Sequence, residues 1–579
     1  FDVSGTLNGS SLGDLPSALV ANTGTIQANG GTVHLTVSQA VRLVGNAISL
    51  GGVVEATTIG TSAGAIVLSA STGDVSVSGR ISAVGDGAGE KGGTVGVRGD
   101  TVTLGAGAVV NVSGEGGGGS VKIGSDTAPV QSVDIAATAT IQADGTRTGA
   151  GGTVALSAAG SISHAGRITA NGLGAGAGRG GTVAMQAGTR ATIDGTVTAS
   201  AQGSTAPGGW TLATGSDLLV AAKADPTRPD ASFVSASAVQ GALDNVTSVS
   251  LATPGDLDVT SAITRTLGTT TLRPTLDLKA GDDITLATGA TLRGVTARGF
   301  NVSMAANSDA VAGDTDRQAG DVIVNAAIST FGGKFTSSGV DFTNNVGIGT
   351  SSGVIDIRHT GLVTVGNGLS TTGSAGADLT IVAGREDGQG IRLGGPLSST
   401  NGTISLTGPV TLVADSTLSA GAGHIIIDGT IDGARALTLN AAGRTELKGA
   451  VGGTTALTSL VADRGVSLTA GSVRTTGSQT YLDNSTSLNG SYSTTVQPFM
   501  ATGTVTVASG TVINTNGGAL TLGPVKGTGS LRLINVFGAL TLGGVDGLSA
   551  LEITSITGVG LAGGTYRMAG DAGFNFTNT

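Results

Sequence analysis

Two adjacent carboxylates, Asp282 and Asp283, are the residues of this sequence best suited by type and spacing to acid–base chemistry. A pair of carboxyl groups can cleave a glycosidic bond, with one group acting as the acid and the other activating water. The pair follows Gly281 and precedes the alternating segment Ile284-Thr-Leu286, so it begins a predicted strand. We favour the simpler interpretation, solvated turn carboxylates, because no further polar motif accompanies the pair.

A second motif, Arg98-Gly99-Asp100, spells the tripeptide that integrins recognise. It follows the predicted strand of Val95 and Val97, so we expect it to lie at an exposed corner. A plain Gly-Asp turn is the alternative interpretation. Arg98, Gly99 and Asp100 are therefore the candidate ligand-binding residues, and the sequence predicts no catalytic residue.

Residues with metal-ligand chemistry are scattered. The segment from Gly313 to Asp321 contains carboxylates that could offer oxygen ligands to calcium, but it lacks the tandem glycine–aspartate nonapeptide of calcium-binding β-rolls. The histidines stand singly, without the spacing of a metal site. We predict no cofactor, with calcium at residues 313–321 as the alternative, and we interpret the histidines as surface residues: His34, His164, His359 and His424.

The composition excludes several classes of protein. Among 579 residues, 102 are glycine, 14 are aromatic and none is cysteine, so disulfide scaffolds and thiol catalysis are excluded. The glycines keep no three-residue register, which excludes collagen, and a mean hydropathy of +0.28 argues against disorder. A net charge of −10 and the lack of basic runs argue against a nucleic-acid partner. No apolar stretch approaches the ~20 residues of a membrane-spanning helix.

A repeat organises the chain. Short strands such as Gly79-Arg-Ile-Ser-Ala83 recur at a nearly constant interval along its first part. Each is followed by a second strand, as in Gly152-Thr-Val-Ala-Leu156, and by a third, as in Val133-Asp-Ile135. Apolar residues alternate with small or polar ones, which indicates strands with one buried face. The equivalent positions of the first strand are Ile26, Val54, Ile81, Val110, Ile141, Ile168 and Val197.

A unit of three short strands cannot bury its inner face alone, so the repeat predicts stacked coils. We predict an all-β, right-handed parallel β-helix with three short strands per coil of about 28 residues. Residues 1–225 form its regular part, and residues 226–579 continue it less regularly, after an excursion at Lys223–Asp230. Glycine-rich segments at 85–93, 114–119 and 172–181 are expected to be flexible surface decoration.

Outward positions carry rows of Thr, Ser, Asn and Gln. Such ladders can bind a polymer through many weak hydrogen bonds. Aromatic side chains, which sugar-binding surfaces use for stacking, are few. Nearly all the phenylalanines and all three tyrosines lie in the second part of the chain, where we expect them to pack in the core or at the end of the coil stack.

Several segments resemble large secreted exoproteins of the filamentous haemagglutinin type, which Gram-negative bacteria export by two-partner secretion. The resemblance rests on Asn22–Leu35, Gly52–Thr57, Gly92–Asp100 and Gly443–Leu457. In that family an N-terminal secretion domain with Asn-Pro motifs engages an outer-membrane transporter, the partner that the resemblance implies for the full-length protein. Because no proline follows an asparagine here, we expect most of that domain to be missing from this chain.

The resemblance implies a non-enzymatic adhesin on the Gram-negative cell surface. It would attach cells to one another, to exopolysaccharide or biofilm matrix, or to a host surface. Two alternatives stay open. One is an inert shaft or filament subunit that self-associates end to end through its terminal coils. The other is a β-helical polysaccharide-degrading enzyme that uses Asp282 and Asp283.

Overall fold

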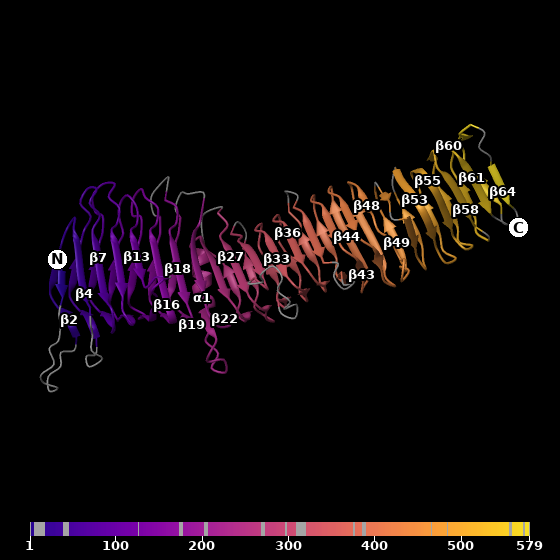
Figure 1. The fold of residues 1–579 in the computed structure, drawn as a ribbon. Coiled ribbons are helices and arrows are strands. Elements are labelled where there is room, and N and C mark those ends of the chain that lie inside the picture. The colour runs from indigo at the N-terminus through magenta and orange to yellow at the C-terminus, as the bar shows by residue number, and fades with distance from the viewer. Residues whose placement is uncertain are drawn as a thin grey trace. The chain divides into compact units, whose positions relative to one another are not determined.

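Stacked parallel strands build the chain, which divides into two compact units, Phe1–Gly320 (unit 1) and Asp321–Thr579 (unit 2). Within each unit, neighbouring strands lie side by side and pair in register (Figure 1), so the fold is a parallel β-helix. The computed structural model describes residues 2–4, 18–38, 46–125, 127–172, 178–201, 206–267, 272–295, 298–308, 320–373, 377–384, 390–464, 466–469, 471–482, 485–535, 537–554, 558–570 and 574–577.

The predicted repeat is confirmed in unit 1. The seven positions taken as equivalent lie on seven neighbouring strands of one parallel sheet, sheet 1. Ile26 pairs with Val54, Val54 pairs with Ile81, and the same register continues to Val197. From Val54 onward these side chains are at most 1% exposed. The strands of sheet 1 are β3 (Thr25–Gln27), β6 (Val53–Glu55), β9 (Arg80–Ser82), β12 (Val109–Asn111), β15 (Thr140–Gln142), β17 (Arg167–Thr169) and β20 (Thr196–Thr198).

The second predicted strand type forms sheet 2, which carries the candidate site. Val154 pairs with Val121 on one side and with Val183 on the other, and Trp210 continues this buried column. The strands of sheet 2 are β1 (Asp2–Ser4), β4 (Thr32–Val37), β7 (Ala65–Ala70), β10 (Thr94–Arg98), β13 (Ser120–Ile123), β16 (Thr153–His164), β18 (Thr182–Ala187), β21 (Gly208–Ala213), β24 (Thr247–Thr253), β27 (Thr275–Ala280) and β30 (Asn301–Ala305).

The third strand type forms sheet 3, which the second half of the long strand β16 joins. Its inward residues, such as Val102 and Leu104, are fully buried. Each buried aliphatic side chain contributes about 1.5–3 kcal/mol through the hydrophobic effect. The other strands of sheet 3 are β2 (Ala18–Asn22), β5 (Asn46–Leu50), β8 (Val75–Val77), β11 (Thr101–Leu104), β14 (Val130–Ile135), β19 (Arg190–Ile193), β22 (Leu218–Ala221), β23 (Ser232–Ser235), β25 (Leu257–Val259) and β28 (Ile284–Leu286).

The glycine-rich segments differ from our expectation. Instead of projecting as decoration, their described parts stack on one another, because Gly114 bridges in parallel to Gly85 on one side and to Gly145 on the other. The stacking is too close for side chains. A Cβ added at Gly92 would lie 1.7 Å from the carbonyl oxygen of Val112. These glycines therefore build an ordered ladder at one corner of the coils.

A helix that the repeat did not predict interrupts sheet 1. Helix α1 (Ala236–Asp244) packs against β20, β24 and the next strand of this corner, β26 (Ile263–Arg265), which pairs with β29 (Leu292–Gly294). Ser235 caps the helix by accepting the N–H of Ala238. The Asp244 carboxylate accepts the N–H groups of Thr266 and Leu267, just beyond β26. The Asp244 side chain of α1 thus provides hydrogen-bond acceptors for backbone N–H groups, a role that carbonyl groups of a neighbouring strand fill elsewhere in sheet 1.

The predicted excursion lies shortly before this helix. The guanidinium of Arg228, in this excursion, forms ion pairs with the carboxylates of Asp217, at 3.4 Å, and Asp258, at 2.5 Å. Beside the excursion, β22 and β23 are buried along their whole length, since Leu219, Ala221 and Phe233 form a small apolar cluster.

Unit 2 keeps the parallel stacking with shorter coils. Ile348 on β35 (Ile348–Gly349) pairs with Ile328 before it and with Leu369 after it, so the coils here are shorter than those of unit 1. The buried hydroxyls of Thr330 and Thr350 donate to carbonyl oxygens of Gly333 and Gly353, and these bonds hold successive corners. The expectation that aromatic residues lie in the core holds for several side chains of unit 2, which are at most 1% exposed: Phe335, Phe342, Tyr481, Tyr492 and Phe499. Phe537 differs, since it is 69% exposed.

The described part of the chain contains no helix that is long and apolar enough to cross a membrane.

Candidate ligand-binding groove

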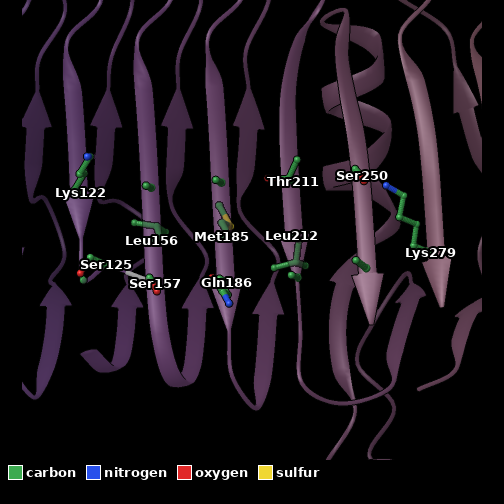
Figure 2. A pocket seen from close by; sticks show the side chains of 15 residues that line it. Lys122, Ser125, Leu156, Ser157, Met185, Gln186, Thr211, Leu212, Ser250 and Lys279 are labelled. Atoms are coloured by element: carbon green, nitrogen blue, oxygen red, sulfur yellow. The ribbon is translucent and has the colours of Figure 1, made fainter. Parts of the chain in front are cut away.

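A shallow groove of about 390 Å³ lies on the outer face of sheet 2. It crosses the strands from β13 to β27, with Lys122 near one end and Lys279 near the other (Figure 2). Its long direction therefore follows the direction in which the coils stack. All the residues that line it belong to unit 1.

The register of the coils explains the hollow. Lys122 pairs with Ala155, Ala155 with Ala184, and the column continues to Thr211 and Ser250. These positions face outward because they alternate with the buried ones. Four small side chains in a row, between Lys122 and Asp277, leave a depression in the surface.

The floor of the groove is held rigidly from beneath. Leu156, Met185 and Leu212 are adjacent to the small outward residues in the sequence, and each is at most 2% exposed. Because their strands are bonded on both sides in sheet 2, the floor cannot move without breaking the stack. The groove is thus preformed.

One end of the groove carries a lysine, and at the other end a lysine is paired with a carboxylate. The lining residues of the groove include two lysines and no carboxylate. The Lys279 ammonium lies 3.0 Å from the carboxylate of Asp277, which also accepts a hydrogen bond from Ser250 at 3.1 Å. Among the described residues, Lys122 has no carboxylate within ion-pair distance. The groove therefore carries a small excess of positive charge, at its Lys122 end, on a chain whose net charge is −10.

The tripeptide Arg98-Gly99-Asp100 lies at the corner between β10 and β11, as predicted. The Asp100 carboxylate accepts the N–H of Gly73 at 2.8 Å, and the Asp100 N–H donates to the Gly73 carbonyl at 2.9 Å. Arg98 is exposed. The aspartate therefore fastens two successive coils, and integrin binding by this motif stays a prediction.

Asp282 and Asp283 lie in the turn before β28. The Asp283 carboxylate accepts the N–H of Gly320 at 2.8 Å, while its own N–H donates to the carboxylate of Asp256 at 3.2 Å. The Asp256 N–H in turn donates to the carboxylate of Asp217. Burial raises the pKa of Asp256, and the charges of Asp217, Asp283 and Asp258 raise it further. These aspartates form a ladder that satisfies backbone amides across coils, which supports the turn interpretation.

The prediction that the four histidines lie on the surface is wrong for two of them. His34 is exposed between the buried Val33 and Leu35, as predicted, and His424 is exposed as well. His164, at the end of β16, and His359, at the end of β36 (Ile355–His359), are only 1% and 3% exposed. Both occupy inward positions of their strands, which the alternation of Ile162-Ser-His164 already indicates.

The buried histidines make stability depend on pH. Burial lowers the pKa of His359 to about 4, although the nearby backbone of Val340 and Asp341 opposes this effect. The folded pKa lies below the unfolded value near 6.5. The unfolded chain therefore takes up the proton first, so stability is full above pH ~6.5 and is lost as the pH falls toward 4.

We expect His359→Leu to remove this contribution. Between pH 7 and pH 4.5, the unfolding free energy of the unchanged protein should fall by about 2 kcal/mol more than that of the variant. Urea titrations of both proteins at the two pH values measure the difference. The exposed residue gives the control, since His34→Leu should leave the pH dependence unchanged. Equal pH dependence of the His359→Leu and unchanged proteins would contradict the buried, neutral state of His359.

The calcium alternative concerns Gly313–Asp321, of which residues 313–319 lie outside the described residues. Among those described, no group of three or more His, Asp or Glu side chains is arranged to hold a metal ion.

The fold defines the protein's class as a parallel β-solenoid. No model of a known protein family matches the sequence. No curated protein matches it significantly.

Proposed function

We propose that this protein is a secreted bacterial surface adhesin whose solenoid attaches the cell to polysaccharide or to a neighbouring cell. The observation that carries the proposal is the groove on sheet 2, where small side chains repeat once per strand along the stacking direction. A surface with this repeat offers equivalent contacts to successive units of a polymer. The resemblance to haemagglutinin-type exoproteins supports the same function, a place on the outer surface of a Gram-negative cell, and export through a two-partner secretion transporter.

The mechanism is multivalent binding. Each hydroxyl or amide along the groove, such as those of Thr211, Ser250 and Gln186, contributes one weak contact. Linked contacts add up, because after the first has formed the others become intramolecular. The preformed floor keeps the entropy cost of binding low. No chemical step is needed for this function, and the Asp283 carboxylate is used in holding coils together.

Deletion of the gene that encodes this chain tests the proposal. We expect cells to lose clumping and attachment, while other exoproteins are secreted normally. Expression of the unchanged gene should restore both properties. Full clumping in the deletion strain would contradict the adhesin and favour an inert shaft. Purified chains that lengthen into filaments with rising concentration would favour the filament subunit.

A further inference from the structure

The dimensions of the groove match an extended polymer. Lys122 lies on β13 and Lys279 on β27, five strand spacings apart in sheet 2. Neighbouring strands are ~4.8 Å apart, so the two lysines are separated by about 24 Å along the stack. This distance suits a chain of several linked sugar units better than a single small molecule.

The chemistry of the floor suits a polymer of hydroxylated units. Ser157, Gln186, Thr211 and Ser250 provide hydroxyl and amide groups on four successive strands. The lining contains no aromatic ring, and Trp210, on the same strand as Thr211, is fully buried. Recognition here must therefore come from repeated hydrogen bonds and from charge, without ring stacking.

The charge of the groove selects the class of polymer. Two lysines line it and no carboxylate does. The acidic chain as a whole repels polyanions, so a basic groove lowers that repulsion at one place. Asp277 fixes the position of Lys279 and neutralises part of its charge, whereas Lys122 is available to a ligand anion. An anionic polymer would gain a charge-assisted hydrogen bond at Lys122 that a neutral polymer could not form.

We infer that the groove on sheet 2 binds a linear anionic polysaccharide that lies across the strands, an inference that rests on the proposed adhesin function. The acidic groups of this polymer lie near Lys122 and Lys279. The acidic groups are carboxylates or sulfates carried on successive sugar units. The hydroxyls between the lysines bind the sugar hydroxyls. The strand repeat sets the orientation of the polymer along the coil stack.

Charge reversal and obstruction of the groove test the inference. In Lys122→Glu/Lys279→Glu both ends of the groove become acidic, and in Ala184→Phe a ring fills the middle of the floor. The matched control is Lys91→Glu/Lys526→Glu, which makes the same change in net charge at two exposed lysines outside the groove. Circular dichroism and urea titration establish that each variant is folded.

Binding of the full chain is measured by affinity electrophoresis in gels that contain polygalacturonate or, for comparison, neutral dextran. We expect the unchanged protein to bind polygalacturonate and to lose affinity as salt is raised. The charge-reversed variant should bind about tenfold more weakly, because it loses two charge contacts and its new carboxylates repel the polymer. Ala184→Phe should also weaken binding, and the control should match the unchanged protein.

Three outcomes would overturn the inference. Equal binding of dextran, unaffected by charge reversal, would mean a neutral ligand and would leave the adhesin proposal intact. No binding of polygalacturonate by the unchanged protein would exclude the anionic polymer, while the clumping assay decides the adhesin proposal separately. Self-association that Ala184→Phe abolishes, without polymer binding, would mean that a second copy of the chain occupies the groove.

Discussion

Val154→Asp should lower the free energy of unfolding by about 4 kcal/mol, because it places an unpaired carboxylate in the interior of the coil stack. Val154 is 1% exposed, and Val121 and Val183 flank it in the same buried column. Neither neighbour can donate a hydrogen bond to a carboxylate. A urea titration followed by far-ultraviolet circular dichroism measures the shift of the unfolding midpoint.

The neighbouring residue provides the control for this substitution. Thr153 points outward and is exposed, and its hydroxyl donates to the Ser120 hydroxyl at 3.0 Å. Thr153→Asp should change stability by less than about 1 kcal/mol. Equal unfolding midpoints for Val154→Asp and the unchanged protein would contradict the inward assignment of the whole column.

Gly151→Ala should destabilise unit 1 by about 3 kcal/mol, although it adds a single methyl group. A Cβ at Gly151 would lie 1.9 Å from the carbonyl oxygen of Ala170 and 2.5 Å from the backbone nitrogen of Gly181. Both contacts are backbone, so the stacked loops would have to move apart. The same urea titration measures the effect.

Gly96 is the matched glycine, since it lies on β10 with no atom within 4 Å of an added Cβ. Gly96→Ala should leave stability unchanged or raise it by about 0.5 kcal/mol, because alanine loses less backbone entropy in a strand. If the glycine-rich loops were flexible, Gly151→Ala and Gly96→Ala would have equal effects on the free energy of unfolding. Equal effects would therefore contradict the close stacking of the glycine ladder.

The parallel β-helix could be predicted because its coils repeat in the sequence. The nearly constant interval between equivalent positions from Ile26 to Val197 identified the seven strands of sheet 1, and every predicted pair is observed. Such regularity arises because each coil must place one apolar side chain above the previous one. In unit 2 the coils near Ile348 are shorter than those of unit 1. The interval of about 28 residues found in unit 1 therefore does not identify equivalent positions there.

Helix α1 could not be predicted from the repeat, since its signals are local. Ser235 at the cap and the apolar residues Ala236, Val239 and Leu243 follow helical spacing, but the segment is only nine residues long. The glycine ladder was missed for a different reason. Glycine-rich sequence is compatible with flexibility and with close stacking, and only the pairing of Gly85, Gly114 and Gly145 distinguishes the two.

The groove was predicted only as a general property, namely rows of small polar residues facing outward. The position of the groove depends on which outward residues become neighbours on adjacent strands. Coils of unequal length change which residues these are. The coil from Lys122 to Ala155 is longer than the coil from Ala155 to Ala184, yet both pairs are neighbours in sheet 2. The sequence predicted the alternation that turns Ala155 outward, while the structure was needed to place it beside Lys122.

Binding without cleavage is the central claim of this account. The most direct test incubates the purified chain with a panel of bacterial and host polysaccharides and records co-sedimentation and released reducing ends together. We expect co-sedimentation with at least one polysaccharide and no release of reducing ends. Release of reducing ends that Asp282→Asn or Asp283→Asn abolishes would contradict the account and identify a polysaccharide-degrading enzyme.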